Sequence, residues 1–264
     1  PQAGNQSIQS GSTGPQAGDL STQSGPTGSQ TGTVTAPASG ILEYRTNVPV
    51  NGTAGAVQDM ELSMPAVSAE AAILFDATHN TVLFEKNADE KLYPASITKL
   101  MTALLVLEKA DLNDTVVFSK TAVTNLESGA VTLNLQEGDR VSVRDCLYGL
   151  LLKSANEVAN GLAEHVGGSI QGFADLMNQR AAELGCTGTH FTNPSGLNDE
   201  NHYTSAYDMA LISQAAFSNP TFVEIDSTTY YDVPAGKLKQ YPDGWRYYAH
   251  HRMLKKNDSL YYDG

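Results

Sequence analysis

The composition of the first forty residues limits where a fold can form. They contain one charged residue, Asp19, and are otherwise mostly Gly, Ser, Thr, Gln, Pro and Ala. Residues 1–14 and 15–28 match at ten of fourteen positions, and neither copy has the apolar positions that a core or a solenoid needs. We therefore expect a disordered spacer over residues 1–42, an uncertain lead-in over 43–65, and the folded domain over 66–264.

The charge of the chain limits its partners. The formal net charge is −13, almost all of it beyond residue 40, so the chain has no basic surface for nucleic acid and should be repelled by anionic lipid. No run of eighteen apolar residues occurs, so membrane contact would need an anchor that is not present in this chain. A polar spacer ahead of a folded domain fits an exported protein held at a membrane or wall.

The periodicity of apolar residues predicts one hairpin, a long helix and a helix-rich block. Runs 71–76 and 81–85 flank a polar turn and predict the hairpin. Apolar spacing and capping signals predict helices over 95–110, 142–153, a following segment to 167, 169–185 and 205–217, the last halted by Asn219-Pro220. Strand-like pieces occur at 115–118, 131–133, 230–233, 245–248 and 259–264. Cys146 and Cys186 are expected to be buried thiols, although a bridge between them stays open.

Ser96 and Lys99 stand three residues apart at the start of the first predicted helix, in YPASITKLMT. Residues at this spacing are neighbours on a helix, so the amine can reach the hydroxyl. The positive end of the helix and the apolar neighbours Ile97, Leu100 and Met101 would lower the pKa of Lys99 and let it act as a base. An isolated S-x-x-K can equally be a helix start with a lysine extending to solvent.

A second polar element, Ser154-Ala155-Asn156, lies at a predicted break between two helices. Ser154 could share a proton with Lys99 and pass it to a leaving nitrogen. The Asn156 amide could donate to a substrate or accept from Lys99. Taken alone, the same residues could simply satisfy backbone groups in a turn.

Together these segments resemble a known family. Residues 93–102 are similar to the P-A-S-x-T-K-x-M-T signature of the low-molecular-weight penicillin-binding proteins, the serine-type D-alanyl-D-alanine carboxypeptidases, and Ser154 and Asn156 match their S-x-N motif. The resemblance extends from about Ala66 to the end of the chain and includes segments such as FTNPSGL (191–197) and HYTSAYDMA (202–210).

The resemblance implies an α+β fold, with an antiparallel sheet flanked by helices, a mostly helical subdomain and a cleft between them. It implies that Ser96 attacks the bond between two D-alanines ending a peptidoglycan stem peptide, with Lys99 as base, Ser154 as proton relay and Asn156 positioning the substrate. β-Lactam antibiotics would acylate the same serine. The implied setting is extracytoplasmic, secreted or wall- or membrane-associated in a bacterium, in wall maturation and cell shape. No metal or cofactor is implied, and His190, His202, His250 and His251 lack metal-ligand spacing.

The chain departs from the family pattern in its third motif. No Lys or His after Asn156 is followed by Thr-Gly, although a K-T-G strand usually supplies a cation for the substrate carboxylate and lies beside an oxyanion donor. The chain ends at Asp263-Gly264, about where that strand should begin, and we expect an incomplete catalytic domain with little or no activity alone. Glu157 stands where Asp is usual and is not expected to carry chemistry.

Several alternatives stay open on the same residues. A D,D-endopeptidase would use the same scaffold. A β-lactamase would need a deacylating base, for which Glu183 and Glu200 are the candidates. A non-catalytic wall-binding relic would keep the motifs without turnover.

Overall fold

The computed structural model describes residues 66–124, 126–254 and 256–257. The predicted spacer over 1–42, the lead-in over 43–65 and the strand-like piece at 259–264 lie outside these residues and stay predictions.

The described residues form an α+β fold that is richer in helix than in sheet. Its elements, in chain order, are β1 (Ala72–Asp76), β2 (Thr81–Lys86), the 3-10 turn η1 (Ala95–Thr98), α1 (Lys99–Lys109), β3 (Thr115–Val117), α2 (Lys120–Thr124), β4 (Arg140–Ser142), α3 (Val143–Lys153), α4 (Asn156–Gly167), α5 (Ile170–Glu183), α6 (Ala206–Phe217), α7 (Pro220–Asp226), β5 (Tyr230–Val233), β6 (Trp245–Tyr248) and the 3-10 turn η2 (Arg252–Leu254). Within the described part, the strands form three antiparallel pairs, β1–β2, β3–β4 and β5–β6. The expected antiparallel pairing is confirmed, in three short sheets rather than one.

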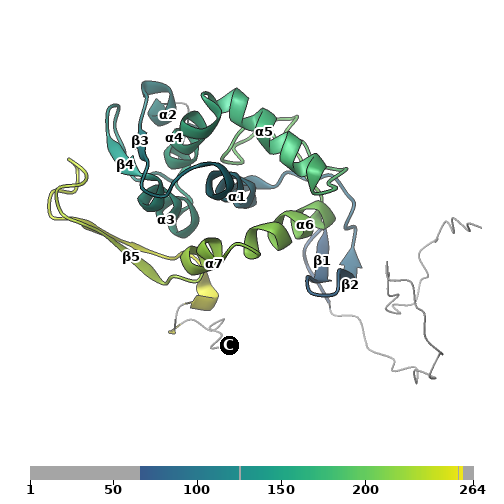
Figure 1. Ribbon diagram of the computed structural model, residues 1–264. Coiled ribbons are helices and arrows are strands. Elements are labelled where there is room, and N and C mark those ends of the chain that lie inside the picture. The colour runs from purple at the N-terminus through teal and green to yellow at the C-terminus, as the bar shows by residue number, and fades with distance from the viewer. Residues whose placement is uncertain (1–65, 125, 255, 258–264) are drawn as a thin grey trace, which may run out of the picture. The chain divides into compact units, whose positions relative to one another are not determined.

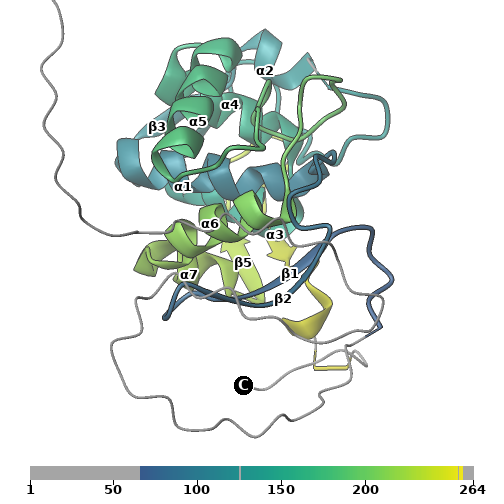
Figure 2. The ribbon, with the colours of Figure 1, turned by 90° about the vertical axis from the view of Figure 1, so that its right-hand side faces the viewer.

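Helix α1 is the centre of the helical part. It contacts α3, α4, α5, α6 and α7, and Figures 1 and 2 show these helices arranged around it. Met101, Ala103, Leu105 and Val106 have no exposed surface. A helix that is apolar on every side is stable only when it is surrounded, so the composition of α1 accounts for its position. Its first residue, Lys99, therefore enters the domain interior.

Side-chain caps fix most of the helix starts. The hydroxyls of Ser142, Ser169 and Ser205 accept hydrogen bonds from backbone N–H groups three residues further on, at the starts of α3, α5 and α6. Asn219-Pro220 ends α6 as predicted, but it also begins α7, which the sequence reading missed: Asn219 caps the new helix and Pro220 occupies its first turn.

The strand predicted at 131–133 is wrong. The backbone of residues 131–135 pairs with no strand and instead lies alongside the start of α4. The Val131 carbonyl accepts from the Asn156 N–H at 2.9 Å, while the Glu157 carboxylate accepts the N–H of Leu133 at 2.5 Å and that of Leu135 at 3.4 Å. Strand β3 pairs with β4, a strand that was not predicted.

Two further expectations can be compared with the described residues. Cys146 is buried and Cys186 half-buried, and both are free thiols, so the bridge that was left open does not form. Within residues 66–124, 126–254 and 256–257, no helix combines the length and apolarity needed to cross a bilayer.

Candidate active site

Ser96 and Lys99 meet at the junction of η1 and α1. Ser96 lies in the 3-10 turn, where side chains three residues apart eclipse one another. The Lys99 Nζ lies 3.2 Å from the Ser96 Oγ. Ser96 is exposed, whereas Lys99 is only 3% exposed. The predicted contact is confirmed: an accessible hydroxyl lies against a buried amine.

Two carbonyl oxygens from distant parts of the chain also bind the Lys99 amine. Asn156 Oδ1 accepts from Nζ at 2.9 Å and the Ser195 backbone carbonyl accepts at 2.6 Å. A neutral amine has two N–H donors and one lone pair. If the two carbonyls take both donors, the lone pair is left for the Ser96 hydroxyl. The arrangement is therefore suited to removing a proton from that hydroxyl.

Burial lowers the pKa of Lys99 to about 8. The predicted direction is confirmed, but part of the reasoning was wrong, because Ile97 is half exposed and does not enclose the amine. The amine is enclosed by the segments that carry Asn156 and Ser195, whose oxygens lie within hydrogen-bond distance of it. An amine in a medium of low polarity loses part of the hydration that stabilises its ammonium form.

The Asn156 side chain is held in one orientation. Its Nδ2 donates to the Val131 carbonyl at 3.0 Å, so its Oδ1 faces Lys99. This residue begins α4, directly after the break that the sequence predicted. The amide accepts from Lys99, as predicted.

Ser154 lies at that break. It ends α3 with φ 59° and ψ 35°, a left-handed conformation, and its side chain is half-buried. Among the described residues its hydroxyl forms no hydrogen bond with the amine. The structure therefore does not bring the predicted proton relay into direct contact with the base.

The loop that carries the Ser195 carbonyl is braced by Asn193. The Asn193 Oδ1 accepts the N–H of Ser195 at 3.1 Å and that of Gly196 at 2.8 Å. Thr102 in α1 donates its hydroxyl to the Pro194 carbonyl at 2.7 Å, which ties the loop to the central helix. Sequence reasoning used this stretch only as part of the resemblance, although Asn-Pro-Ser-Gly is a turn signature.

Gly196 packs directly on Ala95, the residue before Ser96. A Cβ at this position would lie 1.8 Å from the carbonyl oxygen of Ala95, and the backbone of Gly196 has φ +80°. Ala95 itself has φ 49°. Position 196 therefore requires glycine, both for its backbone conformation and for the close approach to the Ser96 turn.

His202 stabilises the η1 turn through a hydrogen bond to Thr98. Its Nδ1 accepts the Thr192 N–H at 3.1 Å, so its proton lies on Nε2, which donates to the Thr98 hydroxyl at 2.9 Å. Burial lowers the pKa of His202 to about 4, and the ring stays neutral at ordinary pH. His202 is a buried histidine, only 2% exposed.

Comparison with known proteins assigns the chain to a family. The model of the D-alanyl-D-alanine carboxypeptidase family, peptidase family S11, matches residues 58–263. The chain belongs to this family. The predicted resemblance is thereby confirmed.

Individual S11 relatives show the extent of the similarity. The D-alanyl-D-alanine carboxypeptidase DacF of Bacillus subtilis is 36% identical over 168 residues, which are 62% of this chain and 42% of DacF. The chain thus spans about two fifths of the length of DacF and of DacC of Escherichia coli. Two solved structures align over three quarters of the chain. A Mycobacterium tuberculosis D-alanyl-D-alanine carboxypeptidase has a TM-score of 0.67 at 30% identity, covering 76% of this chain and 74% of that one. A serine-to-alanine mutant of the Streptomyces K15 DD-transpeptidase has a TM-score of 0.68 at 26% identity, covering 74% and 78%.

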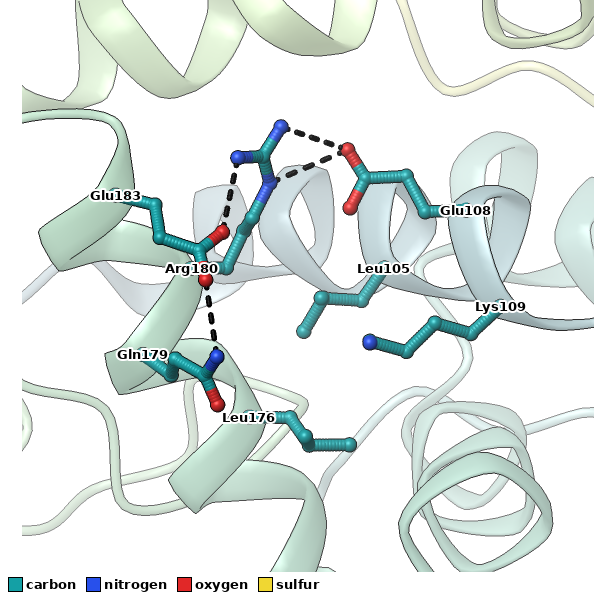
Figure 3. A pocket seen from close by; sticks show the side chains of 7 residues that line it. All are labelled: Leu105, Glu108, Lys109, Leu176, Gln179, Arg180 and Glu183. Atoms are coloured by element: carbon teal, nitrogen blue, oxygen red, sulfur yellow. Dashed lines mark hydrogen bonds and ion pairs between the residues drawn. The ribbon is translucent and has the colours of Figure 1, made fainter.

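A surface pocket lies between α1 and α5 (Figure 3). It is lined by Leu105, Glu108, Lys109, Leu176, Gln179, Arg180 and Glu183. Arg180 bonds Glu108 at 2.9 Å and Glu183 at 3.1 Å. Lys109 is ten residues beyond Lys99, about 15 Å along the helix axis.

This placement bears on the two glutamates considered as deacylating bases. Glu183 is held in the ion pair of the surface pocket, far from Ser96, so it is not part of the site. Glu200 is exposed, and among the described residues it has no hydrogen bond to Ser96 or Lys99. The structure therefore gives no support to a β-lactamase built on either residue.

Proposed function

We propose that the protein is a serine-type D-alanyl-D-alanine carboxypeptidase that acts on peptidoglycan stem peptides through an acyl-enzyme on Ser96. The observation that carries the proposal is the set of contacts around the Lys99 amine. Two carbonyls take its N–H donors, and the remaining direction faces an accessible hydroxyl. Family membership supports the choice of substrate class.

The first step follows from these contacts. Neutral Lys99 accepts the Ser96 proton as Oγ bonds to the carbonyl carbon of the penultimate D-alanine. The C–N bond to the last D-alanine then breaks, and its nitrogen takes a proton. Ser154 is proposed to relay that proton from the Lys99 ammonium. Because no direct bond joins Ser154 to Lys99 here, the relay requires a rotation of the serine or contact through the substrate.

The second step releases the product. Water adds to the acyl carbon and Ser96 leaves as the alcohol, with Lys99 again handling the proton. A β-lactam would follow the first step and stop at the acyl-enzyme. We propose that Asn156 binds the substrate amide as well as the amine. Stem peptides and β-lactams are thus the proposed partners, and an extracytoplasmic, exported setting in wall maturation and cell shape is proposed with them.

Covalent labelling tests the proposal. The protein is incubated with a fluorescent penicillin, digested, and mapped by mass spectrometry. Each molecule is labelled once and the adduct persists, so labelled protein accumulates with time and even slow acylation is detected. We expect the adduct on Ser96 and none in Ser96→Ala. Folded protein that carries no adduct at Ser96 after prolonged incubation would contradict the proposal.

Two other outcomes would redirect it. Rapid hydrolysis of a chromogenic cephalosporin with no lasting adduct would indicate a β-lactamase. Cleavage of cross-linked muropeptides in preference to terminal D-alanine would indicate an endopeptidase.

A further inference from the structure

Glu157 is a buried carboxyl group with no part in the steps above. It is 1% exposed and lies in the first turn of α4, next to Asn156. Burial raises the pKa of its carboxyl, although the helix N-terminus favours the charged form. Its Oε2 is buried without a hydrogen-bond partner among the described residues. Burying such a group is costly, so its role needs an explanation.

The other oxygen of Glu157 binds the backbone of the segment 131–135. Oε1 accepts from the N–H of Leu133 at 2.5 Å and from that of Leu135 at 3.4 Å. Both leucine side chains are buried, which holds the segment against the domain. Apolar packing does not fix the direction of the peptide groups, however. Without Glu157 these two N–H groups would be buried and unpaired, so the segment would have to turn or move.

The same segment orients Asn156. The Val131 carbonyl accepts from both the backbone N–H and the Nδ2 of Asn156, at 2.9 and 3.0 Å. The Val131 side chain is 42% exposed, so packing contributes little to holding this carbonyl in place. If Val131 moved, the Asn156 amide would lose the bond that turns its Oδ1 toward Lys99.

We propose that Glu157 is a positioning residue for the base. By fixing the segment 131–135 it orients the Asn156 amide, and through that amide it orients the Lys99 amine. The expectation that this position carries no chemistry is thus refined: Glu157 touches no reacting atom and acts through three intervening contacts. The expected effect of Glu157 on the rate of Ser96 acylation rests on the proposed function, whereas its effect on the orientation of Asn156 does not.

The test compares three variants. Glu157→Met fills nearly the same volume and removes the acceptor without leaving a buried charge. Glu157→Gln keeps an acceptor oxygen for the two N–H groups. Asp208→Leu is the matched control, since Asp208 is also a buried carboxylate, 2% exposed, that accepts a backbone N–H, from Gly188 at 2.7 Å, but it lies in α6 without contacting Asn156.

The first readout does not depend on activity. Hydrogen exchange of the Asn156 side-chain amide, followed by NMR, should accelerate at least about tenfold in Glu157→Met and stay near the wild-type rate in Glu157→Gln and Asp208→Leu. Unchanged exchange in folded Glu157→Met would overturn the inference. Equal acceleration in Glu157→Gln would overturn it as well.

The second readout links the inference to the reaction. The rate constant for Ser96 labelling by penicillin should fall at least about tenfold in Glu157→Met and less than about threefold in the other two variants. If wild-type protein is not labelled at all, the proposed function fails, whereas the exchange measurement still decides the role of Glu157. A purely structural role would lower the melting temperature of Glu157→Met without slowing its labelling, and that result would refute the proposal.

Discussion

The pH dependence of Ser96 acylation follows from the burial of one amine. Only neutral Lys99 can accept the serine proton, and burial lowers the pKa of Lys99 to about 8. About one molecule in ten then has the neutral base at pH 7, and about nine in ten at pH 9. The rate constant for acylation should therefore rise about tenfold between these pH values and level off above them.

An ordinary lysine would give a different curve. With a pKa near 10.4, the neutral fraction would rise about a hundredfold over the same interval without a plateau. His202 does not contribute, since its pKa of about 4 lies outside the window. The two curves are therefore easily separated.

The assay is rapid-quench labelling with a fluorescent penicillin at limiting concentration, from pH 6 to 10, corrected for alkaline hydrolysis of the reagent. Lys99→Arg is the control, because a guanidinium stays charged throughout and should give no labelling. A rate independent of pH between 7 and 9, or a hundredfold rise without a plateau, would refute the reasoning that burial tunes this base.

Three further results are expected. Gly196→Ala should lower the free energy of unfolding by about 3 kcal/mol or more in urea titrations, since its Cβ would overlap the Ala95 carbonyl; a loss below about 1 kcal/mol would contradict the packing described. Asn193→Ala should lower the free energy of unfolding by about 1–3 kcal/mol in the same titration and slow the labelling of Ser96, because two backbone N–H groups lose their acceptor near the Ser195 carbonyl. An unchanged labelling rate would show that this loop does not influence Lys99. His202 has a lower pKa in the folded than in the unfolded chain, so the free energy of unfolding has its full value above about pH 6.5. It should fall by about 2 kcal/mol, allowing for solvent screening, as the pH drops toward 4. His202→Gln should remove this dependence on pH, and its persistence in that variant would assign it to other groups.

The local part of the site could be predicted from the sequence, but its long-range part could not. Ser96 and Lys99 are joined by helical spacing, and Asn156 by a recognisable second motif. The Ser195 carbonyl has no such signal, because every residue has a carbonyl and only the folded loop selects this one. Ser154 shows the opposite case, since its motif was recognised but its contact with the amine is not made.

The errors in the fold have the same origin. Residues 131–133 alternate as a strand does, yet the N–H of Leu133 bonds to a side chain, Glu157, which periodicity cannot show. Asn219-Pro220 is both a stop and a start signal, and only the packing of Phe222 and Ile225 shows that α7 follows. Composition thus identified the apolar segments, while the partner of each polar group depended on tertiary contacts.

The two carbonyls that hold the Lys99 amine have a consequence for biosynthesis. They lie 57 and 96 residues downstream of the lysine. A nascent chain that has emerged only as far as the first helix already displays the hydroxyl and the amine, but the amine is hydrated and charged. The proposed acylation of Ser96 would therefore become possible only after the loop around residue 195 has been synthesised and packed.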